Sequence, residues 1–108
     1  MRSLLVALAA VFAVAAPASA QSTTLVINEV DYDQTGTDAA EFLEIKNVST
    51  APIDLDPYQL RFVNGATGMN YLTVNLPAVD LAGGDHYVVC ANPATTAACD
   101  LDGAPTRT

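Results

Sequence analysis

The segment that decides the fold is Glu41-Phe42-Leu43-Glu44-Ile45-Lys46-Asn47-Val48. Leu43 and Ile45 fall on one side of an extended chain, whereas Phe42, Glu44 and Lys46 fall on the other. A period of two is typical of a strand that buries one face, so the segment predicts a strand over residues 41–48.

Similar short segments lie on both sides of it. Tyr58–Val63 alternates in the same way, with Tyr58, Leu60 and Phe62 predicted to point inward. Further strands are expected at Thr23–Val30, Tyr71–Leu76 and His86–Ala91, with a brief one around Ile53 and Leu55.

Turn residues separate these segments. Asn64-Gly65 is a strong turn pair, Pro77 ends a strand, and Leu81–Asp85 is expected to be a turn. Asp100–Thr108 shows no strand pattern, and residues 103–108 are expected to be disordered. Five or six short strands, with no helical period outside the N-terminal segment, predict an all-β sandwich.

The N-terminal segment is expected to direct export. Arg2 precedes an unbroken apolar stretch, Leu4–Ala16, and Pro17 and Ala18-Ser19-Ala20 follow it. This order is typical of a secretory signal peptide, with cleavage between Ala20 and Gln21. The apolar stretch spans roughly 20 Å, short of the roughly 30 Å of a bilayer core, so a membrane anchor is disfavoured. The mature domain is therefore expected to cover residues 21–108, in the periplasm or outside the cell.

The charge of the chain limits its partners. The 108 residues carry 4 basic and 12 acidic side chains, a net charge of −8. Such a surface repels phosphate backbones, so direct nucleic-acid binding is not expected. No later segment is long and apolar enough to span a membrane. The ligand expected instead is an unidentified extracellular protein or surface molecule.

An exported protein can form a disulfide between its two cysteines, because the compartments outside the cytoplasm are oxidising. Cys90 and Cys99 enclose a loop of about ten residues, and a disulfide there would contribute about 2.5–3 kcal/mol of stability. Two free thiols are the alternative. A metal site would need more ligands than two cysteines and the distant His86 supply. We favour the disulfide.

The densest acidic group follows the first predicted strand. Asp31, Asp33, Thr35 and Gly36 match the first half of a calcium-binding loop, but position 12 is Phe42 instead of glutamate. The missing helices exclude a true EF-hand. A looser calcium site would use Asp31, Asp33, Thr35, Asp38 and Glu41, whereas the alternative is an ordinary solvated acidic loop. No other cofactor is expected.

No catalytic constellation is evident. A serine triad would have to combine His86 with Ser22 or Ser49, and neither serine lies on a strained turn. Paired carboxylates on an exposed loop make a poor glycosidase cleft, and Gly83-Gly84 is not followed by a helix that could cradle phosphate. We therefore expect a protein that is not an enzyme.

Aromatic residues offer one further hint. Tyr58, Phe62 and Tyr87 are expected in the core. Tyr32 and Tyr71 lie beside loops and could face a partner, although an ordinary structural role is favoured for both.

Four segments, in order, resemble the lamin tail domain of secreted bacterial proteins. The first two are Val26–Gln34 and Glu41–Asn47. The third, Ile53–Leu60, has Pro57 where the family usually has glycine, and the fourth is Leu81–Cys90. The resemblance covers about Val26 to Asp102, and it implies an immunoglobulin-like β-sandwich used as an accessory module.

The resemblance also implies two functional alternatives. The first is a non-catalytic extracellular binding or structural module that recognises its ligand through loops or an open sheet edge. The second is the accessory part of a secreted nuclease or phosphatase whose catalytic domain is absent from this chain. The family usually carries further strands after the cysteine-rich loop, so a C-terminal truncation is expected. An open edge would also allow oligomerisation or strand swapping.

Overall fold

The computed structural model describes residues 22–33, 35–36 and 39–104. The predicted signal peptide and most of the segment expected to be disordered lie outside these residues. The described part is all-β, and it contains no helix that is long and apolar enough to cross a membrane. Its strands are β1 (Leu25–Asp31), β2 (Phe42–Asn47), β3 (Ile53–Asp54), β4 (Gln59–Val63), β5 (Asn70–Asn75), β6 (Asp80–Leu81), β7 (His86–Cys90) and β8 (Leu101–Asp102).

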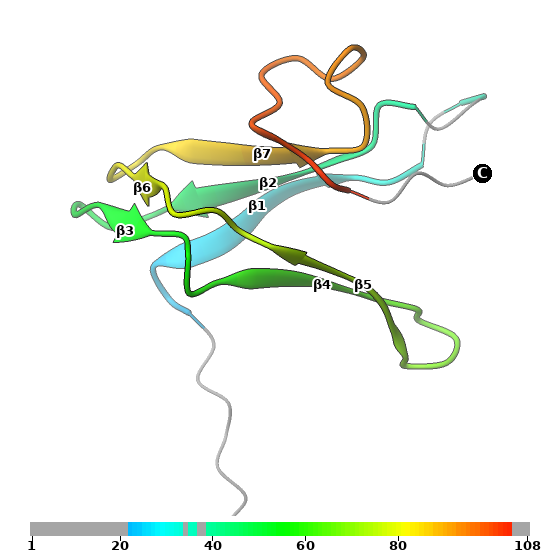
Figure 1. The fold of residues 1–108 in the computed structure, drawn as a ribbon, viewed down its shortest axis with the longest axis horizontal. Coiled ribbons are helices and arrows are strands. Elements are labelled where there is room, and N and C mark those ends of the chain that lie inside the picture. Colours follow the sequence, from blue (N-terminus) through cyan, green and yellow to red (C-terminus); the bar gives the residue numbers. More distant parts are fainter. Residues whose placement is uncertain (1–21, 34, 37–38, 105–108) are drawn as a thin grey trace, which may run out of the picture.

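One layer is a four-stranded sheet with the order β1-β2-β7-β8 (Figure 1). The alternation predicted for β2 is confirmed, since Leu43, Ile45 and Asn47 are buried while the residues between them are only partly covered. β2 pairs with β7 so that Leu43 lies opposite Val89 and Ile45 lies opposite Tyr87. Because opposite residues share a face, these side chains form one apolar inner surface.

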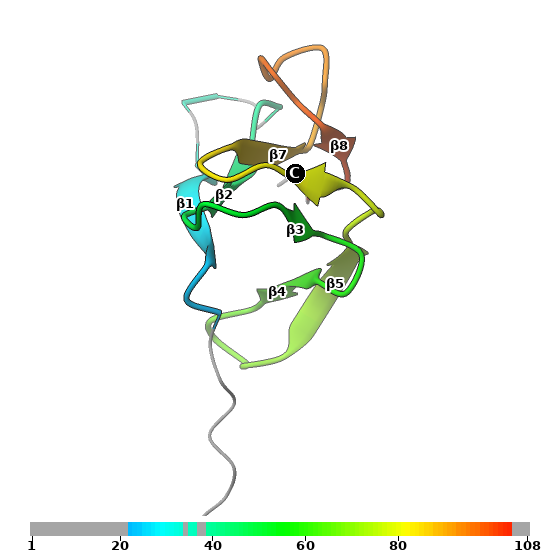
Figure 2. The ribbon, with the colours of Figure 1, turned by 90° about the vertical axis from the view of Figure 1, so that its left-hand side faces the viewer.

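The second layer consists of the β4–β5 pair, with the short β3–β6 pair at one end of the sandwich. Leu60 lies opposite Val74 and Phe62 lies opposite Leu72, and all four side chains are half-buried. The inward orientation predicted for Tyr58, Leu60 and Phe62 is therefore confirmed. Figure 2 shows the two layers end on, with β4 on the side of β1 and β5 on the side of β8.

The core lies between the layers. Tyr87 is buried in it, and Tyr58 packs against it, as the sequence predicts. Phe62 points inward without joining the central cluster. The buried apolar residues of that cluster are Leu43, Ile45, Leu55, Leu76, Leu81, Tyr87 and Val89. The fold class expected from the sequence, an immunoglobulin-like β-sandwich, is confirmed.

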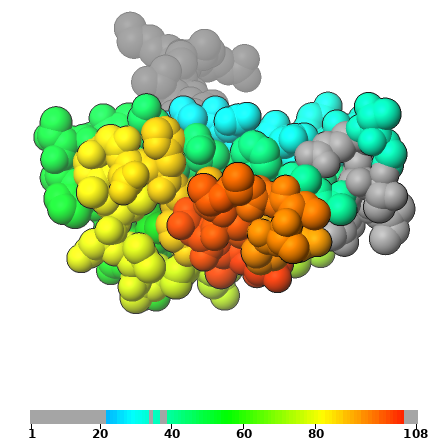
Figure 3. Space-filling view, turned by 90° about the horizontal axis from the view of Figure 1, so that it is seen from above, coloured from blue at the N-terminus to red at the C-terminus, as the bar shows by residue number. Residues whose placement is uncertain are grey.

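The expected disulfide joins Cys90 to Cys99, with Cα atoms 5.7 Å apart. Cys90 lies opposite Phe42, on the outer face of the four-stranded sheet. The disulfide therefore holds residues 91–100 over that face, as the space-filling view shows (Figure 3). Val88 is buried by this arrangement although it points away from the core.

The expectation that Asp100–Thr108 contains no strand is wrong for its first residues. β8 pairs in parallel with β7, Asp100 N donates to Val88 O at 2.9 Å, and Leu101 packs against the core. A strand of two residues has no periodicity that a sequence pattern could reveal. The position of β8 is set instead by the disulfide and by pairing with β7.

Leu81 also differs from its expected place in a turn. It pairs with Ile53 in the β3–β6 ladder and is 4% exposed, so it belongs to the core. The turn itself is shorter than expected, and Asp85 N donates to Ala82 O across it at 3.1 Å. Within the described residues eight strands form where five or six were expected, because β6 and β8 have only two residues each and show no periodicity in the sequence.

The turn that contains Pro57 forms even though this residue replaces the glycine usual at the position. Tyr58 N donates to Leu55 O at 2.9 Å and closes the turn. Leu55 is completely buried at its start. The local departure from the family pattern therefore leaves the entry into β4 intact.

Candidate functional site

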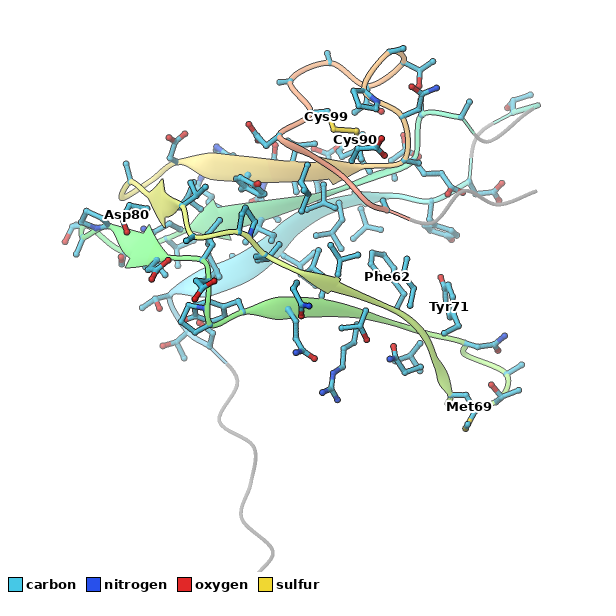
Figure 4. All side chains as sticks on the ribbon, in the orientation of Figure 1. Phe62, Met69, Tyr71, Asp80, Cys90 and Cys99 are labelled. Carbon is cyan, nitrogen blue, oxygen red and sulfur yellow. A yellow bond between two sulfur atoms is a disulfide. The ribbon has the colours of Figure 1, made fainter. Side chains whose placement is uncertain are left out.

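The two layers diverge at the end of the sandwich where β1 ends and β2 begins. A hollow of about 230 Å³ opens there, walled by β1 and β2 on one side and by Phe62 and Tyr71 on the other. Figure 4 shows Phe62 and Tyr71 pointing from the β4–β5 layer into the space between the layers. The residues that line this interlayer hollow are Val30, Asp31, Tyr32, Glu41, Phe42, Leu43, Phe62, Tyr71 and Ala104.

The inner face of β1 is largely uncovered. Ile27 lies opposite Ile45 and Val30 lies opposite Leu43, so both side chains share the face that β2 buries. Yet Ile27 is 60% exposed and Val30 is 52% exposed. The β4–β5 layer has fewer strands than the four-stranded sheet, and it leaves Ile27 and Val30 on the inner face of β1 uncovered.

Phe62 and Tyr71 form an aromatic pair on one wall of the hollow. Their ring centroids are 6.3 Å apart, and their planes are tilted by 54°. The β4–β5 register shifts between Phe62 and Val63, which leaves Tyr71 as an extra residue between the regular pairs. Tyr71 remains 59% exposed. Its ring therefore presents an exposed aromatic surface to the hollow.

Two members of the predicted calcium set, Asp31 and Glu41, line the same hollow. Asp33 and Thr35 are exposed on the intervening loop, and Asp38 lies outside the described residues. Among the residues that the structure describes, no three histidine, cysteine, aspartate or glutamate side chains gather closely enough to hold a metal ion. The structure thus brings together the two ends of the predicted set, and calcium binding stays a prediction.

A second hollow of about 380 Å³ lies on the outer face of the four-stranded sheet, below the disulfide loop. It is lined by three carboxylates, those of Glu29, Asp31 and Glu44. Glu44 accepts a hydrogen bond from Asn28 Nδ2 at 2.7 Å, and its Oε1 lies 3.7 Å from Nε2 of His86. The negative charge of this face would favour a cationic ligand over an anionic one.

The residues considered for a serine triad do not come together. Ser22 Oγ accepts a hydrogen bond from Leu25 N at 3.0 Å, and Ser49 Oγ donates to Asn47 Oδ1 at 2.7 Å. His86 instead lies against Glu44. Both serines are engaged in local backbone and side-chain structure, and neither contacts His86 among the described interactions.

The arrangement defines a class of protein: a small all-β sandwich, closed by one disulfide, with an open apolar space between its layers. The sequence matches the family model described as Lamin Tail Domain over residues 18–107. The chain therefore belongs to the lamin tail domain family. Neither the search of curated proteins nor the search of solved structures found a match.

The sequence pattern does not reveal the interlayer hollow. The strand at Tyr58–Val63 follows from alternation and the one at Thr23–Val30 from its β-branched residues, whereas Tyr71 lies beside a loop, where an ordinary structural role is favoured over a partner-facing one. No local signal reports how many strands the opposite layer contains. The uncovered state of Ile27 and Val30 therefore emerges only when the two layers are placed together.

Proposed function

We propose that this chain is an exported, non-catalytic binding module, and that it binds an apolar segment of its ligand in the interlayer hollow. The observation that carries the proposal is the exposure of Val30 and Tyr71 on opposite walls of one hollow. Val30 lies opposite Leu43, which is buried, and Tyr71 is followed by Leu72, which is half-buried. A ligand would cover apolar surface that the domain itself leaves in water.

The energetics favour such an occupant. Burial of apolar surface contributes roughly 25 cal/mol per Å², and contiguous exposed apolar surface commonly marks an interaction site. Other exposed apolar residues lie directly after β1 and on the β4–β5 hairpin. These additional residues are Tyr32, Val63 and Met69.

Nile red, a neutral apolar dye, tests the hollow. We expect its fluorescence to rise on addition of the purified protein and to fall markedly in Val30→Ser. Val48→Ser is the matched control, because Val48 is 50% exposed, close to the 52% of Val30, and follows the opposite end of β2. Equal fluorescence from the two variants would overturn the assignment of the hollow.

Export is supported by the disulfide, because such bonds persist mainly in oxidising compartments. The signal peptide and its cleavage before Gln21 are part of this proposal. We expect N-terminal sequencing of the protein recovered from an exporting bacterial host to begin at Gln21. A retained Met1 would contradict cleavage.

The non-catalytic character fits the lamin tail domain family and the separation of His86 from both serines. The alternative, an accessory domain of a secreted nuclease or phosphatase, stays a prediction, because no described residue bears on it. In either case the purified chain should show no turnover of phosphodiesters or phosphomonoesters. Turnover that copurifies with the chain through several columns would contradict the proposal.

A further inference from the structure

One edge of β4 is open. Leu76 N donates to Tyr58 O at 3.0 Å, so the main-chain carbonyl of Tyr58 points toward β5. Every second residue of a strand repeats this orientation, so the main-chain groups of Leu60 and Phe62 also point toward β5. In an antiparallel pair, the residues between these hydrogen-bonded positions turn their main-chain groups the other way. The N–H and C=O groups of Gln59 and Arg61 therefore face away from β5. The described residues place no further strand beside them.

This edge lies on the side of the uncovered inner face of β1. Figure 2 shows β4 on the β1 side of its layer and β5 on the opposite side. At the β5 side, a Cβ atom added to Gly103 would lie 3.4 Å from Val74 Cγ1, so the segment after β8 already covers that part of the layer. A strand added beside β4 would instead lie beneath Ile27 and Val30, and its inward side chains would cover them.

The charge on the outer face of β4 indicates the kind of strand that fits. Arg61 lies at the centre of β4, is exposed, and has no carboxylate within ion-pair distance among the described residues. Its Nε donates to Gln59 Oε1 at 2.7 Å. An acidic side chain directly across the new pair would complement this charge.

A second copy of the chain is a poorer occupant. Pairing β4 with the β4 of another copy over its full length would place Arg61 opposite its own counterpart, and like charges directly opposite are destabilising. A charged residue at the centre of an open edge is a common protection against such self-pairing.

We propose that the free edge of β4 accepts an extended segment of another polypeptide, in which apolar residues alternate with acidic ones. The apolar residues would cover Ile27 and Val30 and reach the interlayer hollow, and an acidic residue would lie across from Arg61. This inference rests on the proposed function, because it assigns a partner to the same binding surface. Main-chain hydrogen bonds would supply affinity, and the side-chain pattern would supply specificity.

Two short capped peptides test the pairing, one alternating valine with glutamate and the other alternating valine with lysine. Isothermal titration at physiological ionic strength gives the ratio of their dissociation constants for the purified protein. In Arg61→Glu we expect this ratio to shift by about tenfold in favour of the lysine peptide, since each exposed ion pair changes affinity by a few-fold. Lys46→Glu is the matched control, because it changes the net charge equally on the other layer. That control should leave the ratio within about twofold of the wild-type value.

The outcomes separate this inference from the proposed function. An unchanged ratio in Arg61→Glu, binding of neither peptide, or a stable dimer without peptide would each overturn the assignment of the β4 edge. The Nile red difference between Val30→Ser and Val48→Ser judges the hollow independently. Should Arg61→Glu fail to fold, Arg61→Gln removes the charge alone and is expected to give about half the logarithmic shift. No shift in that variant would also overturn the inference.

Discussion

The side-chain amide of Asn47 donates a hydrogen bond to the main-chain carbonyl of Leu81 at 2.9 Å, across 34 residues of sequence. The same nitrogen donates to Ala51 O at 2.8 Å, and Asn47 Oδ1 accepts from both N and Oγ of Ser49. Asn47 is completely buried. One polar side chain thus joins the end of β2 to β6 and to the loop between β2 and β3, with its donors and acceptor satisfied.

Asn47→Ala should destabilise the domain by about 3 kcal/mol, because it leaves buried main-chain groups without their partners. Urea unfolding followed by circular dichroism measures the change in the free energy of unfolding. Asn75→Ala is the control, because Asn75 is exposed at the end of β5 and should change stability by less than about 0.5 kcal/mol. A similar loss in both variants would contradict the role assigned to Asn47.

Gly83→Ala should destabilise the domain by about 1–3 kcal/mol through a steric clash with the main chain. A Cβ atom at Gly83 would lie 2.6 Å from Thr50 C and 2.9 Å from Ser49 O. The main chain of this loop cannot move aside as a flexible side chain could. Gly65→Ala is the control, since no atom lies within 4 Å of its added Cβ. Equal thermal midpoints for the two variants would refute the close approach.

Loss of the disulfide should lower the free energy of unfolding by about 3 kcal/mol, the value expected for a loop of this length. Urea unfolding with and without reductant measures the loss. The double variant Cys90→Ala, Cys99→Ala should match the reduced protein and should not respond to reductant. A wild-type protein that is insensitive to reductant would show that the bond between Cys90 and Cys99 does not stabilise the fold.

The burial of Tyr87 predicts that the free energy of unfolding falls at alkaline pH. Burial raises the pKa of its phenol above the ordinary value of 10.0, and the nearby carboxylate of Asp100 raises it further. Above about pH 10 the unfolded chain therefore releases this proton before the folded protein does, so the free energy of unfolding falls as the pH rises. Urea unfolding between neutral pH and pH 11 should show this fall. It should be shallower in Tyr87→Phe than in the wild-type protein, and an equal fall in both would contradict the role assigned to Tyr87.

If the predicted loop binds calcium, the midpoint of thermal unfolding should be higher in millimolar calcium than in chelator. Binding to the folded state alone stabilises it by mass action. Asp33→Asn should remove the rise by deleting an expected ligand, whereas Asp56→Asn, on a different loop, should retain it. Equal midpoints with calcium and with chelator in the wild-type protein would contradict the calcium prediction.

Residue alternation by itself determined the strands β2 and β4. Leu43 and Ile45 on one face, and Leu60 and Phe62 on another, were readable because successive side chains of a strand point to opposite sides. The pairing of Cys90 with Cys99 was also readable, since the chain offers no other cysteine. These features depend on neighbours in the sequence.

The tertiary structure alone decided where these faces meet. β8 forms because the disulfide places Leu101 beside Val89, and Leu81 is buried because it lies opposite Ile53. Val30 stays exposed because the opposite layer, which has fewer strands, leaves it uncovered. Periodicity is a local property of the chain, whereas strand pairing and layer width arise from contacts between distant residues. The proposed binding surface depends on those contacts, so it could not be predicted from the sequence pattern.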